Sequence, residues 1–209
     1  MELQTLWKQH WQGIGAGGDG MLLFEQLCAA YQEPHRHFHT LQHLQECFEC
    51  WIGWRNEAVH SHEIGLALWF HDAILDVTRH DNEARSARWA NEALQQAGCV
   101  PEVALRVRDL IIATRHDAPP QNVDAQLIVD IDQAILGAAP ARFEEYTQQL
   151  RREAAAVTDF IYQRRHLKNL QSYLSSMPIF HTSRARALLE ARARDNITQA
   201  MTAMRQTAA

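Results

Sequence analysis

Acidic side chains interrupt two apolar, helix-forming stretches of the sequence. In "LALWFHDAIL" the doublet His71-Asp72 stands inside an apolar run, and in "LIVDIDQAIL" Asp130 and Asp132 do the same. An ionised carboxylate is strongly disfavoured in an apolar interior unless it is paired or bound to a cation. We therefore expect a cation or a basic partner at Asp72 and at one of the two later aspartates.

The spacing of the two later aspartates separates their roles. Residues two apart on a helix project about 200° from each other, so only one of them can face the same interior point as Asp72. Asp132 shares a helix face with Ile135 and Leu136. This pattern predicts that Asp132 points inward and that Asp130 lies at the helix rim.

A histidine-rich stretch, "PHRHFHTLQHL" at residues 34–44, offers further ligands. It places four of the twelve histidines within nine positions. Thr40 can cap a helix beginning at residue 41, which puts His43 in the first turn and His39 one helical turn earlier. Imidazoles and carboxylates brought together from distant helices suit a hard or borderline divalent ion. His35 and His37 are expected to be loop residues.

The cysteines are not predicted to bind metal. Cys47 and Cys50 form a C-x-x-C, but Leu44, Cys47, Phe48 and Trp51 follow helical spacing. This places the thiols on an apolar face in mid-helix, with no second close pair to complete a tetrahedral site. We therefore expect reduced cysteines that belong to the core or lie near it.

The elements that must position these residues are predicted to be helices throughout. Apolar residues recur at intervals of three and four, and no stretch shows the alternation of a strand. With 209 residues, 46% apolar and 22% charged, the chain is expected to form one domain, an all-α compact helical bundle. The expected helices cover about 2–12, 21–31, 41–55, 62–75, 82–98, 101–116, 124–136, 140–175 and 183 onward, the last capped by Ser183.

Charge is distributed unevenly along the chain. Residues 1–140 carry 9 Lys and Arg against 19 Asp and Glu, whereas residues 141–209 carry 11 against 6. This pattern is typical of solvated arginine faces on C-terminal helices, although a phosphate-bearing ligand is also compatible with it. Duplex nucleic acid is not an expected partner. Neither a secretory signal nor a membrane-spanning segment is recognisable, so a cytoplasmic protein is expected.

The ordered set of a histidine, a His-Asp doublet and a later aspartate on helices resembles the HD-domain superfamily of metal-dependent phosphohydrolases. The closer resemblance is to its bacterial branch of predicted metal-dependent HD phosphohydrolases. Departures from the expected pattern stand at Leu75, Ala154 and Arg164, none of which is an expected ligand. The matching stretches run from about residue 31 to 197 and are "YQEPHRHFHTLQHL", "WFHDAILD", "HDNEARSA", "DIDQAILG", "PIFHTS" and "EARARDNI".

The resemblance implies a ligand set and a fold. The metal ligands would be His43, His71, Asp72 and Asp132, holding one or two divalent ions from among Mn, Mg, Fe, Co, Ni and Zn. The single HD-type domain over residues 1–209 would have a metal-site core at about 31–140 and a helical C-terminal extension at about 141–205.

Roles for the neighbouring residues follow from this expected site. Asp72 would be a ligand and catalytic, receiving a proton from the attacking water, and Glu83 would assist by holding a water or a ligand imidazole. Arg36 could bind a phosphate through two parallel hydrogen bonds. His39 and His116 would contact substrate.

The expected function is hydrolysis of a phosphoester of a nucleotide or another small phosphorylated metabolite by a metal-activated water. Two alternatives remain open. One is a regulatory module that binds metal or nucleotide without turnover, and the other is a di-iron oxygenase that would use His39 and His116 as additional ligands. A homodimer is compatible with the sequence, and no membrane partner is expected.

Overall fold

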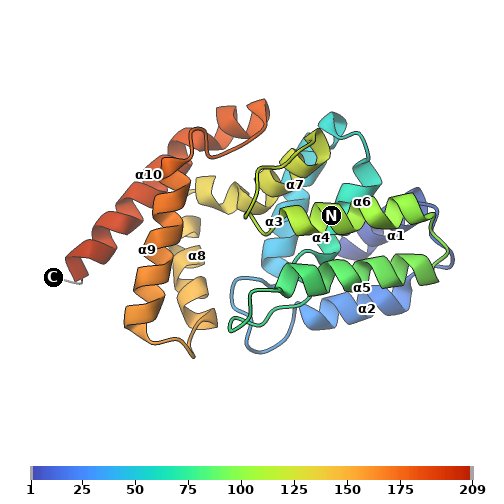
Figure 1. Ribbon diagram of the computed structural model, residues 1–209, viewed down its shortest axis with the longest axis horizontal. Helices are drawn as coiled ribbons and strands as arrows, with labels where there is room; N and C mark the ends of the chain where they lie inside the picture. The colour runs from blue at the N-terminus through green and yellow to red at the C-terminus, as the bar shows by residue number, and fades with distance from the viewer. Residues whose placement is uncertain (1, 208–209) are drawn as a thin grey trace. The chain divides into compact units, whose positions relative to one another are not determined.

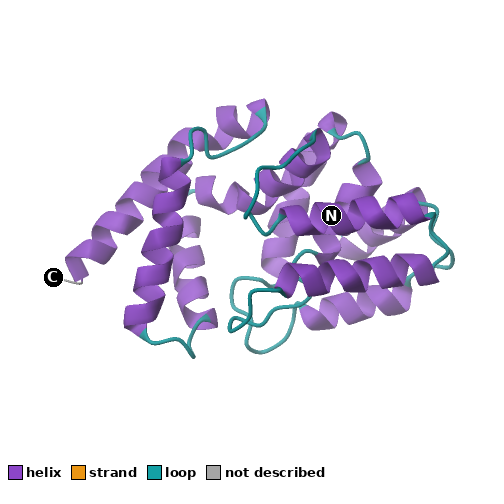
Figure 2. Ribbon diagram, in the orientation of Figure 1, coloured by secondary structure: helices purple, strands orange, loops and turns teal. Residues whose placement is uncertain are grey.

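The computed structural model describes residues 2–207, and in this range the chain is helical, without strands (Figures 1 and 2). The prediction of an all-α fold is confirmed. The α-helices are α1 (Leu3–Gly13), α2 (Met21–Ala30), α3 (Leu41–Trp54), α4 (Ser61–Phe70), α5 (Asn82–Gln96), α6 (Pro101–Ala113), α7 (Val123–Asp132), α8 (Pro140–Glu153), α9 (Asp159–Ser175) and α10 (Ser183–Thr207), with short 3-10 segments η1 (Arg55–Glu57) and η2 (Gln133–Gly137).

The chain divides into two compact units, Met1–Ile131 and Asp132–Ala209. The first contains α1 to α6 and all of α7 except its last residue, and the second contains η2 and α8 to α10. The boundary lies near the expected border between a metal-site core and a C-terminal extension, whereas a single domain over the whole chain stays a prediction. None of the helices in residues 2–207 has the length and apolar character needed to cross a membrane.

Helix α4 is the centre of the first unit. Its residues from Glu63 to Phe70 are all buried, and α1, α3, α5 and α6 pack against it. A helix that is apolar on every side is stable only when neighbours cover it on every side. The His-Asp doublet therefore follows the most enclosed element of the unit.

Helix α4 ends at Phe70, earlier than the expected end near residue 75. The reason is a long-range contact: the guanidinium of Arg36 donates hydrogen bonds to the carbonyls of Asp72 (2.6 Å) and Ala73 (3.0 Å). These carbonyls are thereby bonded to a side chain instead of to later turns of a helix. The doublet consequently lies at the helix end and not inside the helix.

The expected continuous helix over 140–175 is two helices, α8 and α9. Arg151, near the end of α8, donates to the carbonyls of Ala154 (2.9 Å) and Val157 (3.3 Å) and pairs with Asp159 at the start of α9 (Nε–Oδ1 2.9 Å). Carbonyls held in this way stabilise the turn between the two helices.

The N-terminus of α10 is capped by a different residue from the expected one. The hydroxyl of Thr182 accepts a hydrogen bond from the backbone N–H of Ala185 at 3.2 Å, which is the N-cap geometry. Ser183, the expected cap, is instead the first residue of the helix.

A buried histidine marks the contact between α1 and α4. His10 is 3% exposed, stacks on Phe48, and lies so close to Gly65 that a Cβ there would be 2.3 Å from the ring. Neither ring nitrogen has a hydrogen-bond partner among residues 2–207. Burial, with smaller contributions from His62 and Arg55, lowers the pKa of His10 to about 4.

The close approach of α1 and α4 makes glycine necessary at position 65. We expect Gly65→Ala to lower the free energy of unfolding by about 2 kcal/mol, because the added methyl group overlaps the rigid His10 ring. Urea denaturation measures the effect. The matched control is Gly53→Ala in α3, where the new Cβ meets no atom within 4 Å and should stabilise by about 0.5–1 kcal/mol. Equal effects of the two changes would contradict this prediction.

His10 should make the protein sensitive to acid. The pKa of His10 is about 4 in the folded chain and about 6.5 in the unfolded chain. Between these two pH values the unfolded chain therefore binds a proton at His10 and the folded chain does not. Stability should therefore fall as the pH drops from 6.5 through 4, by about 3 kcal/mol in total from this residue. Denaturation at pH 7, 6, 5 and 4 should show a shallower decline for His10→Leu than for wild type; parallel declines would refute the assignment.

Candidate metal centre

Three donor atoms of the first unit lie around one point. His43 is in the first turn of α3, and His71 and Asp72 follow the last residue of α4. The Nε2 atoms of the two histidines are 3.3 Å apart, and Asp72 Oδ2 is 3.0 Å from His71 Nε2 and 3.6 Å from His43 Nε2. The structure thus brings together three of the four expected ligands from segments 28 residues apart in the chain.

These separations suit a shared metal ion. Two donors at about 2.1 Å from one ion lie about 3.0 Å apart when the angle between the bonds is 90° and about 3.4 Å apart when it is tetrahedral. Two of the three observed distances fall in this range and the third is slightly longer. Both imidazoles are almost completely buried, whereas the Asp72 side chain is 17% exposed. The donors fit a divalent ion that can also be reached from solvent.

The helix ends orient the two imidazoles. His71 Nδ1 lies 2.8 Å from the carbonyl of Leu68, which can only accept, so Nδ1 carries a proton and Nε2 is the nitrogen that can offer a lone pair to an ion. The His43 ring packs on Phe38, with ring centroids 4.5 Å apart. Thr40 accepts a hydrogen bond from the N–H of Gln42 at 3.3 Å, which confirms it as the predicted N-cap of α3.

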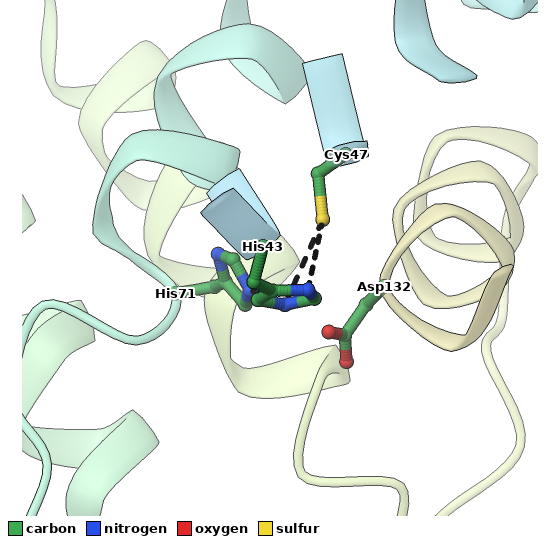
Figure 3. Close-up of side chains that lie close together, drawn as sticks. All are labelled: His43, Cys47, His71 and Asp132. Carbon is green, nitrogen blue, oxygen red and sulfur yellow. Dashed lines mark hydrogen bonds between the residues drawn. The ribbon is translucent and has the colours of Figure 1, made fainter. Parts of the chain in front are cut away.

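Cys47 is the residue that the sequence reasoning left out of the site. It is buried, as expected, but it forms with His43, His71 and Asp132 a group whose potential ligand atoms all lie within 4.8 Å of one another (Figure 3). Its sulfur is 3.7 Å from Nε2 and 3.8 Å from Nδ1 of His43. A sulfur nearly equidistant from both ring nitrogens lies against the ring and not along the Nε2 lone pair, so Asp72 is better placed than Cys47 to share an ion with His43.

The carboxylates at the end of α7 differ from the expectation in one respect. Asp132, the last residue of α7 and an expected ligand, is a member of this group. Asp130 was expected at the helix rim, and this prediction is wrong, because its side chain is completely buried. The reason is that α7 has buried residues on all sides. Its first turn is held by Asp124, whose carboxylate accepts from the backbone N–H groups of Val59 (2.8 Å) and His60 (3.0 Å).

Arg36 has a structural role that the sequence did not indicate. Its side chain is 0% exposed, and Nε donates to Glu33 (3.0 Å) while Nη1 also reaches the carbonyl of His39 (3.2 Å). With the bonds to Asp72 and Ala73, four of its five N–H groups are used. The expected two-bond contact with a phosphate would require Arg36 to leave carbonyls that shape the doublet.

The loop after the doublet is fastened to α5. Asn82 pairs with both backbone groups of Asp76, and the hydroxyl of Ser86 accepts from the N–H of Ile74 at 3.0 Å. These contacts give Asn82 and Ser86 of "HDNEARSA" a structural role.

Three further expected site residues have positions that leave their roles as predictions. Glu83 lies half-buried in the first turn of α5. His39 is half-buried, with its ring 6.0 Å from that of His43. His116 is exposed beyond the end of α6, with a left-handed φ of 56°.

Tyr31 lies beneath this network, with the Arg36 guanidinium 5.3 Å from its ring centroid. Burial and then the neighbouring Asp72 carboxylate hold the pKa of Tyr31 well above its ordinary value, so the phenol stays protonated.

In comparisons with known proteins, no family model, no curated protein and no solved structure matches the chain.

Arg36 should be needed for the stability of the centre. We expect Arg36→Lys to lower the free energy of unfolding by about 2 kcal/mol or more, because an ammonium cannot reach the same carbonyls and leaves buried groups unpaired. Urea denaturation tests this. The control is Arg79→Lys, an exposed arginine paired with Asp81, which should change stability by less than about 0.5 kcal/mol. Similar small effects of both substitutions would show that the Arg36 contacts do not support the fold.

Proposed function

We propose that the chain is a metal-dependent phosphohydrolase of the HD superfamily that cleaves a phosphoester of a nucleotide or another small phosphorylated metabolite. One observation carries the proposal: His43 Nε2, His71 Nε2 and Asp72 Oδ2 lie 3.0–3.6 Å apart, which suits ligation of one ion. The order of a histidine, a His-Asp doublet and a later aspartate along the chain supports it.

The proposed site gives each residue a separate task. His43, His71, Asp72 and Asp132 would hold the ion; Asp72 lies within reach of both histidines, and the group of His43, His71 and Asp132 also contains the buried Cys47. A divalent ion bound there would polarise a phosphoryl oxygen and lower the pKa of a bound water. Asp72, whose side chain is partly exposed, would accept the proton of the attacking water at its carboxylate.

The chain holds these groups ready before substrate binds. The carbonyl of Leu68 accepts a hydrogen bond from Nδ1 of His71, and Arg36 donates one to the carbonyl of Asp72. Such preorganisation removes the free energy of rearranging the ligands during the reaction. Glu83 and His39 are proposed to assist from the solvent side, where a water and a substrate would enter.

Metal analysis of matched variants tests the proposal. We expect purified wild type to carry metal and His71→Ala, Asp72→Asn and Asp132→Asn to retain less than about one tenth of it, because each loses a ligand. Cys47→Ser should retain metal, since Cys47 is expected to pack against His43 and not to bind the ion. The control is His80→Ala, which removes an exposed histidine. Each protein is then incubated with a panel of nucleotides and sugar phosphates, and released phosphate is measured.

Each outcome selects one function. Unchanged metal content in all three ligand variants would refute the site. Bound metal without release of phosphate from any substrate, with each divalent ion tested, would favour the regulatory module. Two bound irons with oxygen consumption would favour the oxygenase. Phosphate release by wild type and by Cys47→Ser, lost in Asp72→Asn, supports the hydrolase.

A further inference from the structure

The second unit contains a cavity of about 750 Å³ that is lined by residues of α8, α9 and α10. None of the residues of the metal centre lines it. Much of its wall is apolar and is provided by Phe143, Ala200 and Met204. The volume lies within the range of about 300–1,000 Å³ that is typical of small-molecule sites.

His166 supplies hydrogen-bonding capacity to this cavity. The residue is 9% exposed, it lines the cavity, and neither ring nitrogen has a hydrogen-bond partner among residues 2–207. One face of the ring is stacked on Tyr162, with centroids 5.4 Å apart and planes 15° apart, so the ring is fixed and its edge is left for a ligand. Because burial lowers the pKa of His166, the neutral imidazole offers one donor and one acceptor near pH 7.

Asn196 supplies an oriented acceptor to the same cavity. It is 4% exposed, and its Nδ2 donates to the carbonyls of Leu136 and Ala138, both at 2.9 Å. These two bonds use both amide hydrogens and fix the amide plane. Its Oδ1 has no hydrogen-bond partner in the described part of the chain and remains available in the cavity that Asn196 lines.

The charges around the cavity favour a neutral ligand. Arg151, the only Lys or Arg among the described lining residues, is held by Asp159 and by the carbonyls of Ala154 and Val157. Its guanidinium also lies over the Tyr162 ring, 5.0 Å from the ring centroid. The remaining lining carboxylate is Glu144. A phosphate group would therefore find no unengaged cation here.

We propose that this cavity binds a neutral, planar heterocycle of the nucleobase type. A ring N–H of the ligand donates to Asn196 Oδ1, and a second polar atom pairs with the edge of His166. The flat faces pack on Phe143 and Met204. This site is independent of the proposed metal-dependent hydrolysis and does not require it.

The test is calorimetric titration of the full chain with adenine, hypoxanthine, cytosine and uracil. We expect saturable binding of at least one base with a stoichiometry of one. His166→Phe preserves the stacked ring but removes both nitrogens, and it should weaken binding about fivefold to tenfold. Ala200→Leu fills part of the cavity and should weaken it more than about twentyfold. The control is Arg165→Ala, an exposed position on α9 that does not line the cavity, with affinity within about twofold of wild type.

Circular dichroism establishes that each variant is folded, and sedimentation gives its oligomeric state. The proposal is overturned if no base binds folded wild type at concentrations up to about 10 mM, because a dissociation constant above that concentration would not indicate a specific site. It is equally overturned if the base binds with unchanged affinity to both His166→Phe and Ala200→Leu. A change of oligomeric state in Ala200→Leu would assign the cavity to a second copy of the chain and would also overturn it.

Discussion

The contact on which the first unit depends is that between the buried guanidinium of Arg36 and the backbone of the His-Asp doublet. Arg36 is sealed from solvent, and its charge faces one partly exposed carboxylate, Glu33, and three carbonyls. A buried guanidinium is tolerable only when nearly all its donors are satisfied, which restricts the loop to one arrangement. In that arrangement α4 stops where His71 and Asp72 can turn toward His43. The same contact thus ends α4 and shapes the candidate metal centre, 36 residues further along the chain.

The end of α4 adds an electrostatic reason for a cation at this place. The last carbonyls of a helix carry partial negative charge, and a cation near them is stabilised. Here the carbonyl of Leu68 bonds to His71 Nδ1, so that this negative end supports the ligand directly. Because α4 is enclosed by four other helices, the imidazole cannot easily move away from the site. Burial of the imidazole, the partial negative charge of the helix end and the lone pairs of the donors therefore all favour a cation at this place.

Local signals in the sequence predicted the parts of the structure that local forces determine. Apolar periodicity predicted helices, Thr40 was recognised as the cap of α3, and His43, His71 and Asp132 were expected together. The early end of α4 and the break between α8 and α9 were not predicted, because each depends on an arginine side chain that donates hydrogen bonds to backbone carbonyls at the helix end. The position of Cys47 one turn after His43 was visible in the sequence. Its apolar setting concealed it, since a buried thiol packs like any small apolar group.

Two buried histidines that lack hydrogen-bond partners among residues 2–207 show how packing separates a structural residue from a binding one. Both nitrogens of His10 are sealed between α1 and α4, where Gly65 leaves space for the ring and for nothing else. No ligand can reach them, so the missing bonds lower stability and serve no binding role. The His166 ring, by contrast, borders a cavity that also receives the fixed amide of Asn196. Two oriented polar groups in one apolar cavity can recognise a molecule that supplies the missing bonds. Whether a buried histidine without hydrogen-bond partners is structural or can bind a ligand therefore depends more on the space beside its ring than on its burial.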